Sequence, residues 1–271
     1  MPELPEVETT RRGIEPYLKD QIITEIIIRD HRLRWPVPET LRKEAHQQKI
    51  IAVTRRGKYL LLKTTGGTII LHLGMSGNLR ILPAATEPKK HDHIDIVLNA
   101  DRCLRFHDPR RFGVCLWTRE DPSHHPLLKN MGLEPWDDKL TADLLHHLSC
   151  KRKTAIKNFI MDSTIIVGVG NIYASEALFL SGIRPTTQAG KISKKRYEKL
   201  ICSIRTVLGR AIEQGGTTLR DFTNGDGKPG YFKQALAVYD RAGKPCLQCQ
   251  QPIIRRIIGQ RSSYYCMNCQ K

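Results

Sequence analysis

The first part of the chain, up to about residue 132, alternates apolar and polar residues with the period of two that is typical of β-strands. The segment KIIAVTRRGKYLLLKT is followed by glycines at 66 and 67 and then by TIILHLGM, which predicts a hairpin. A second hairpin is predicted in HIDIVLNADRCLRFHD, where Ile94, Ile96 and Leu98 alternate with polar neighbours as in a half-buried strand. One helix, over about residues 5–18, precedes the strands. Short strands joined by turns predict a sandwich or a barrel.

From about residue 134 the pattern becomes helical. The segments KRKTAIKNFIMDS and NIYASEALFLSG flank the tight link TIIVGVG, an arrangement that resembles a helix–two-turn–helix element. Residues 194–214 predict an amphipathic helix that ends at Gly215 and Gly216. The apolar face of this helix comprises Tyr197, Leu200, Ile201, Ile204, Val207, Leu208, Ala211 and Ile212.

The charge of the chain points to a polyanionic partner. Among 271 residues, 44 are Lys or Arg and 27 are Asp or Glu, which gives a formal net charge of +17. Nucleic acid is the first expectation and an anionic membrane surface the second. No apolar run reaches the length of a membrane span, and no basic and then apolar leader opens the chain. We therefore expect a soluble, intracellular protein of two domains, or of one domain with an appendage.

Four of the eight cysteines form two C-x-x-C pairs near the C-terminus, separated by sixteen residues. In an intracellular protein this spacing indicates a structural zinc ion held by four thiolates, Cys246, Cys249, Cys266 and Cys269. The intervening residues predict a hairpin that turns near Gly259. From residue 241 onward there are basic residues and no acidic ones, which favours nucleic acid as the partner and makes Arg261 a candidate phosphate contact. The alternative is a zinc ribbon that binds protein or caps the fold.

The glycine-rich link before Asn171 is a candidate phosphate site. Glycines allow a ligand to approach the backbone closely, and the helix that starts near Asn171 offers free N–H groups at its N-terminus. Lys157 could add a second phosphate contact. Read alone, the glycines are as well explained by a turn, and Lys157 by a solvated side chain.

The opening MPELPEVE admits two interpretations. Proline and first-turn carboxylates are typical of a helix start. Removal of Met1 would instead leave Pro2 with the only secondary amine in the chain, beside Glu3 and close to Glu6. A chain-terminal amine has a pKa of about 7.7–8.0, so about a tenth of it is neutral and nucleophilic at pH 7. On these residues alone the helix start is the commoner explanation.

Seven segments appear in a fixed order: PELPEVET, RRGKYL, LHLGMSG, DPRRFG, GVGNIYASE, GGTTLRDF and the paired C-x-x-C motifs. Together they resemble formamidopyrimidine-DNA glycosylase over nearly the whole chain. This resemblance implies an α+β multidomain fold: an N-terminal β-sandwich with an N-terminal helix, a helical helix–two-turn–helix domain and a C-terminal zinc-binding β-hairpin. The corresponding boundaries are 2–132 for the catalytic domain, 133–223 for the DNA-binding domain, 224–236 for a lesion-covering loop and 237–271 for the zinc finger.

The resemblance also implies the chemistry. Pro2 would attack the anomeric carbon of a damaged nucleotide, expel an oxidised purine and form a Schiff base for β- and δ-elimination. Glu3 would be the general acid at the sugar ring oxygen, and Glu6 would order the site. Lys58 would bind a phosphate flanking the lesion. Glu8 is assigned to the helix surface, and His72, His91 and His93 receive no catalytic role.

A stacked base must leave the duplex before it can be attacked, and the gap must be filled. The resemblance assigns this filling to Met75, Arg110 and Phe112, with Arg110 bonded to the orphaned base. For Met75 and Phe112 the alternative is core packing. The loop at 224–236 would cover the extruded base, and Arg220 is a candidate contact in or near the lesion pocket. The same loop could also be a plain linker.

The expected partner is therefore double-stranded DNA that contains oxidised bases or abasic sites. We expect one structural zinc ion, no organic cofactor, no membrane association, a monomer, and a cytoplasmic location in bacteria with association to the nucleoid. Two alternatives remain at this point: an endonuclease VIII-type glycosylase for oxidised pyrimidines, and a non-catalytic zinc-ribbon DNA-binding protein. A scaffold for polyanions at membranes is a weaker third.

Overall fold

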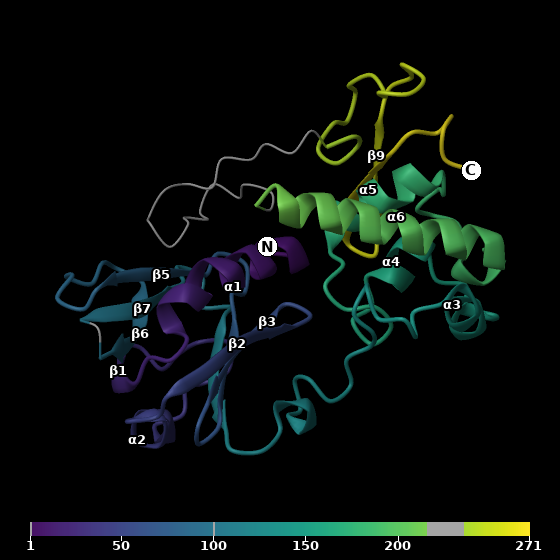
Figure 1. Ribbon diagram of the computed structural model, residues 1–271. Coiled ribbons are helices and arrows are strands. Elements are labelled where there is room, and N and C mark those ends of the chain that lie inside the picture. Colours follow the sequence, from purple (N-terminus) through teal and green to yellow (C-terminus); the bar gives the residue numbers. More distant parts are fainter. Residues whose placement is uncertain (1, 100, 216–235) are drawn as a thin grey trace. The chain divides into compact units, whose positions relative to one another are not determined.

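The computed structural model describes residues 2–99, 101–215 and 236–271 (Figure 1). It divides into two compact units, which among the described residues comprise 2–130 with 215, and 131–214 with 236–271. The helices are α1 (Leu4–Leu18), α2 (Thr40–Ala45), α3 (Ala142–Ser149), α4 (Ile156–Ile160), α5 (Asn171–Ser181) and α6 (Lys194–Glu213), with 3₁₀ turns η1 (Pro122–His124) and η2 (Ala189–Lys191). The strands are β1 (Ile23–Ile28), β2 (Ile50–Arg56), β3 (Tyr59–Thr64), β4 (Thr68–His72), β5 (Asn78–Pro83), β6 (Asp92–Leu98), β7 (Arg102–His107), β8 (Val114–Thr118), β9 (Ile254–Ile258) and β10 (Arg261–Tyr265).

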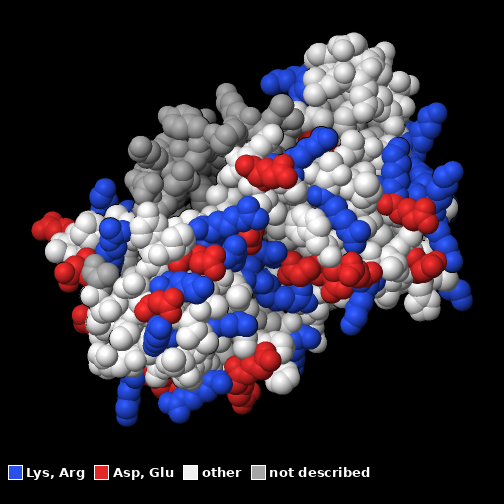
Figure 2. Space-filling model, in the orientation of Figure 1, with Lys and Arg blue, Asp and Glu red and all other residues white. Residues whose placement is uncertain are grey.

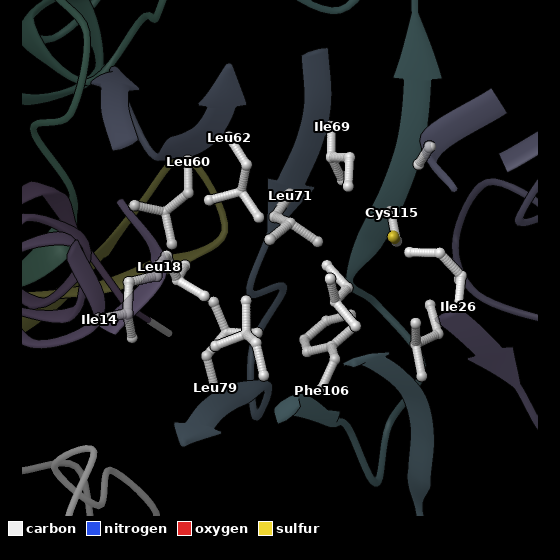
Figure 3. Close-up of a cluster of buried hydrophobic side chains, with 14 of the residues drawn as sticks. Ile14, Leu18, Ile26, Leu60, Leu62, Ile69, Leu71, Leu79, Phe106 and Cys115 are labelled. Carbon is white, nitrogen blue, oxygen red and sulfur yellow. The ribbon is translucent and has the colours of Figure 1, made fainter. Parts of the chain in front are cut away.

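The first unit contains two antiparallel four-stranded sheets, with strand orders β1-β6-β7-β5 and β2-β3-β4-β8. Both predicted hairpins are confirmed: β3 pairs with β4 across the Gly66–Gly67 turn, and β6 pairs with β7. Apolar side chains from both sheets and from α1 form one core (Figure 3). In that view Leu60 and Leu71 of one sheet face Leu79 and Phe106 of the other. The sandwich with an N-terminal helix is therefore confirmed.

Strand β6 differs from the sequence expectation. Ile94, Ile96 and Leu98 are buried as predicted, but Asp95 between them is buried too, with only 1 % of its area exposed, and Val97 is half-buried. Arg105 donates to both oxygens of Asp95 at 2.8 Å and to the carbonyls of residues 86 and 87, so that the segment after β5 covers this face of the sheet. The strand is therefore largely buried on both faces. The alternation predicted that one face would meet solvent, but the ion pair between Asp95 and Arg105 satisfies the polar groups on that face without water.

Replacing Asp95 with Asn is expected to destabilise the first unit by about 3–5 kcal/mol at pH 7, because it removes the hydrogen-bonded counter-charge of the buried Arg105 and leaves only the more distant Asp92 at 3.6 Å. Burial raises the pKa of Asp95, but hydrogen bonds from Arg105 and Arg29 outweigh this and lower it. With a pKa below the usual value of about 3.9, the carboxylate stabilises the fold fully above about pH 4. Its contribution is lost as the pH falls through the lowered pKa.

Urea unfolding of D95N and the natural protein between pH 7 and pH 3 checks this expectation. The difference should shrink below about pH 4, because the natural protein then loses the stabilisation from its ionised Asp95, whereas the amide that replaces this carboxylate in D95N does not titrate. The control is D20N, which breaks the exposed Asp20–Lys49 pair (2.8 Å) in the same unit and should have a much smaller effect on stability, because solvent screens this pair. Equal effects of the two substitutions would contradict the prediction.

The second unit is built around α5 and α6. The amphipathic face predicted for residues 194–214 packs into the core of this unit, and Gly215 follows the helix with a φ of +81°. Helix α4 is shorter than the segment KRKTAIKNFIMDS suggested, and a turn-rich link joins it to α5. Helix α5 is buried almost throughout, since it packs against both α6 and β10.

The C-terminal segment forms the predicted hairpin of β9 and β10 in register Arg261↔Ile258 to Tyr265↔Ile254. Its two-residue turn, Gly259–Gln260, has positive φ at both positions, as a type I′ turn requires. A Cβ atom at Gly259 would lie 2.5 Å from the Asn158 side chain, so a larger residue there would have to displace that side chain. A small core that includes Val238, Ile253 and Tyr264 backs the hairpin. The three predicted parts of the fold are therefore all present.

Candidate active site and nucleic-acid interface

The N-terminus of α1 gathers the predicted catalytic residues. Glu3 is the N-cap of this helix, and its backbone N–H donates to Glu6 Oε2 at 2.8 Å in a capping box. Pro5 occupies the first turn of the helix, whereas Pro2 precedes the N-cap. Pro2, Glu3 and Glu6 are all buried. The helix-start interpretation thus explains Glu3, Glu6 and Pro5, but it gives no reason for Pro2.

Lys58 lies in the two-residue turn between β2 and β3. Gly57, the first residue of this turn, has a φ of +56°, which glycine adopts without strain. Burial and the positive charges of Lys58 and Arg34 lower the pKa of His72 to about 4. His72 is therefore neutral at pH 7, and its Nδ1 accepts the Gly74 N–H at 3.0 Å. His72 therefore connects the two elements: it is close enough to Lys58 to feel its charge, and it holds the start of the loop at Gly74.

Met75 and Phe112 lie at the surface, with 39 % and 43 % of their area exposed, so core packing does not explain them. The guanidinium of Arg110 stacks over the Phe112 ring at 4.9 Å from its centroid. The two loops also touch through their backbones, since a Cβ atom at Gly74 would lie 2.5 Å from the Phe112 carbonyl carbon. The structure thus brings together the three residues expected to fill the gap left by an extruded base.

Asp108, which the sequence analysis did not single out, holds these two loops together. It is fully buried and accepts from Ser76 Oγ at 2.9 Å, from the Gly113 N–H at 2.7 Å and from the Arg110 N–H at 3.3 Å. Its signal in the sequence is the Asp-Pro pair, since aspartate side chains accept from the backbone two residues later in turns. His93 adds a bond to the Asp108 carbonyl oxygen through Nε2 at 2.8 Å.

Lys157 is fully buried, in contrast to the expected phosphate contact. Its ammonium group donates to Ser263 Oγ at 2.6 Å and to the Asn171 side-chain oxygen. The Asn171 amide in turn donates to the Ser262 carbonyl at 3.0 Å. A buried ammonium must be hydrogen-bonded, and these bonds join α4, the start of α5 and strand β10. Asn171 itself is the first residue of α5, whose N-cap is Gly170.

The second residue missed by the sequence analysis is Glu176, the one carboxylate of the largely apolar helix α5. Its oxygens accept the backbone N–H groups of Ala237, Val238 and Tyr239 at 2.8–2.9 Å. A lone acid in an apolar helix is the signal that could have revealed it, because a buried carboxylate needs donors. Glu176 thereby fixes the segment that leads into the cysteine-bearing hairpin.

The four predicted zinc ligands lie together, with all their sulfur atoms within 4.8 Å of one another. The Cys246–Cys269 and Cys249–Cys266 sulfur pairs are 3.9 and 3.4 Å apart. Tetrahedral coordination with Zn–S bonds of about 2.3 Å places sulfurs about 3.8 Å apart, so the site fits zinc. Within the described residues this is the only cluster of metal-ligating side chains, so the histidines at 72, 91 and 93 form none.

Arg261 begins β10 and is exposed beside the type I′ turn. On the face shown in Figure 2, Lys and Arg side chains lie among Asp and Glu side chains and form no single continuous patch. Arg220 and most of the predicted loop at 224–236 lie outside the described residues. No helix in the described parts of the chain is long and apolar enough to cross a membrane.

Three family models match the chain in order. The formamidopyrimidine-DNA glycosylase N-terminal domain matches residues 1–115, and the H2TH domain of the same family matches residues 131–223. A zinc finger found in FPG and IleRS matches residues 243–271. A curated formamidopyrimidine-DNA glycosylase from Methylococcus capsulatus is 56 % identical over 271 residues, 100 % of both chains. This chain belongs to the formamidopyrimidine-DNA glycosylase family.

Solved structures of the formamidopyrimidine-DNA glycosylase family have the same fold. The MutM (Fpg) protein from Thermus thermophilus is 36 % identical, with a TM-score of 0.88 over 99 % of this chain and 98 % of that one. The Lactococcus lactis Fpg, solved in complex with DNA containing an abasic site, is 31 % identical, with a TM-score of 0.91 over 99 % of each chain. The alternative of a non-catalytic zinc-ribbon DNA-binding protein is thereby excluded, since the full length of the chain matches a formamidopyrimidine-DNA glycosylase.

Proposed function

We propose that this chain is a bifunctional DNA glycosylase and AP lyase of base excision repair that removes oxidised purines from duplex DNA. The observation that carries the proposal is the N-terminus of α1, where Pro2 lies just outside a capping box formed by Glu3 and Glu6. This arrangement belongs to a chain whose residues 1–115 match a glycosylase N-terminal domain.

After loss of Met1, the Pro2 nitrogen attacks C1′ of the damaged nucleotide and the base leaves. A secondary amine gives a permanently cationic iminium, which withdraws electrons for successive β- and δ-elimination. Glu3 delivers a proton to the sugar ring oxygen as the ring opens. Glu6 holds the Glu3 backbone N–H, so that the residue next to the nucleophile has one fixed conformation.

Met75, Phe112 and Arg110 fill the gap left by the everted nucleotide, with Arg110 bonded to the orphaned base. Their exposure, and the hold of Asp108 on both loops, support this role. Lys58, Asn171 and Arg261 contact phosphates. Lys157 acts on DNA through Asn171, which it holds in place. Arg220 and the lesion-covering loop at 224–236 stay predictions.

The four cysteines hold one structural zinc ion, whose chemical contribution is to fix the β9–β10 hairpin. We propose domain boundaries at 2–132, 133–223, 224–236 and 237–271. The protein acts as a monomer in the bacterial cytoplasm, associated with the nucleoid when bound to damaged DNA. Its net charge of +17 supports this binding to a polyanion.

Cleavage of matched duplexes tests the substrate class. We expect a duplex with 8-oxoguanine opposite cytosine to be nicked at least about tenfold faster than one with thymine glycol, measured as kcat/KM. An undamaged duplex is the control and should stay intact. The opposite preference would favour the endonuclease VIII-type alternative, and cleavage of neither duplex would contradict glycosylase activity.

A further inference from the structure

Glu8 on α1 has no part in the chemistry proposed above, and the sequence suggested an ordinary surface position. The structure places it differently: its side chain is 12 % exposed and binds three arginines. Arg11 and Arg12 belong to the same helix, and their nitrogens lie 3.0 and 2.9 Å from Glu8 Oε1. Burial raises the pKa of Glu8, but these hydrogen bonds outweigh it and lower the pKa, so Glu8 is ionised at neutral pH.

The third arginine connects Glu8 to another element. Arg55, near the end of β2, donates from Nε to Glu8 Oε2 at 3.3 Å and from Nη1 to the Gly57 carbonyl at 2.8 Å. Its side chain is also 12 % exposed. Because a guanidinium group is rigid and planar, both bonds are made from one fixed plane. Arg55 therefore holds the β2–β3 turn in a set position relative to α1.

The position of this turn matters because Lys58 is its second residue. Gly57 has a positive φ, and its carbonyl group, held by Arg55, belongs to the peptide that leads into Lys58. Glu8 lies on α1, the helix that has Glu3 as its N-cap and Glu6 in its first turn. The bonds from Glu8 through Arg55 to Gly57 therefore connect the helix of these two carboxylates to the turn that carries Lys58. We propose that Glu8, through Arg55, is a positioning residue that fixes Lys58 relative to the catalytic N-terminus. The inference rests on the proposed phosphate contact of Lys58.

If Glu8 only stabilised α1, replacing it would leave the salt dependence of DNA binding unchanged. The Arg12–Glu8 pair is largely solvated, since Arg12 is 58 % exposed, and such helix pairs contribute little. Loss of a positioned lysine instead removes one phosphate contact, which lowers the slope of log K against log salt by about 0.9. The salt dependence of DNA binding therefore separates the two roles.

The test measures binding to a duplex with a tetrahydrofuran abasic analogue at several salt concentrations, for E8Q, K58M and E8Q/K58M. We expect K58M and E8Q each to weaken binding about tenfold. Each should also reduce the slope of log K against log salt by about 0.9. The double variant should bind about as well as K58M, because E8Q acts only by displacing Lys58, and K58M has already removed that lysine. The matched control is E15Q, which removes another partner of Arg11 on the same helix but has no bond to Arg55.

A second measurement needs no DNA. Amide hydrogen exchange across residues 55–60 should accelerate in E8Q and in R55K, whose single ammonium cannot hold both partners, and should be unchanged in E15Q. Unchanged exchange in E8Q and R55K would overturn the inference, as would a full salt slope for E8Q beside a reduced one for K58M. A full slope for K58M itself would count against Lys58 as a phosphate contact in the proposed function, and hydrogen exchange alone would then decide whether Glu8 positions the turn.

Discussion

Insertion of one alanine before Pro2 is expected to abolish covalent trapping of the protein on DNA by borohydride. The insertion turns the Pro2 nitrogen into an amide, which has no basic lone pair and cannot attack C1′. Pro2→Gly should reduce trapping on this duplex without removing it, since its terminal primary amine can still form an imine, but that imine is cationic only when it is protonated. Both variants should bind an abasic-site duplex within about threefold of the natural protein, because the loops and phosphate contacts remain.

The measurement is borohydride reduction on an 8-oxoguanine duplex, followed by separation of the protein–DNA adduct. P5A is the matched control: Pro5 lies in the first turn of α1, and its replacement leaves the terminal amine untouched. Mass spectrometry of the active protein should show Met1 removed. Full activity with Met1 still attached would contradict the proposed mechanism, because the Pro2 nitrogen would then be a peptide amide and the chain would have no secondary amine to act as the nucleophile.

Loss of the metal ion is expected to unfold the C-terminal hairpin and to weaken DNA binding at least about a hundredfold. The hairpin has only a small core of its own, so its stability depends on metal binding, which contributes about 10 kcal/mol or more in comparable modules. Without β10, Lys157 and Asn171 lose their bonds to Ser262 and Ser263, and Arg261 loses its position. Contacts from two elements are therefore removed together.

Chelation with a strong zinc ligand, or the substitution C266S, tests this by anisotropy of a labelled duplex and by hydrogen exchange over 243–271. C202S is the matched control, since Cys202 is exposed on α6 and should tolerate serine without change. Bound metal should be measured at about one zinc per chain before chelation. Unaltered affinity in a preparation shown to be metal-free would contradict the structural role of the site.

Several features of the site were predictable because they are encoded within a few consecutive residues. The spacing of Cys246 and Cys249, repeated at Cys266 and Cys269, predicted the cluster that the structure brings within 4.8 Å. The alternation along β3 and β4 predicted their pairing, and the apolar stripe of 194–214 predicted the buried face of α6. The loops that carry Met75 and Phe112 were predictable from glycine and proline, which mark turns wherever they occur.

The sequence by itself determined two hairpins, the helices at 5–18 and 194–214, the metal ligands and the family, because these follow from local periodicity and short motifs. Only the tertiary structure decided which charges are buried and what they hold. Asp95, Asp108, Lys157 and Glu176 read as ordinary polar residues, yet each is enclosed and bonded to donors or acceptors on other elements. The physical reason is that the state of a buried charge depends on partners far away in the chain, and folding alone brings these partners within hydrogen-bond distance.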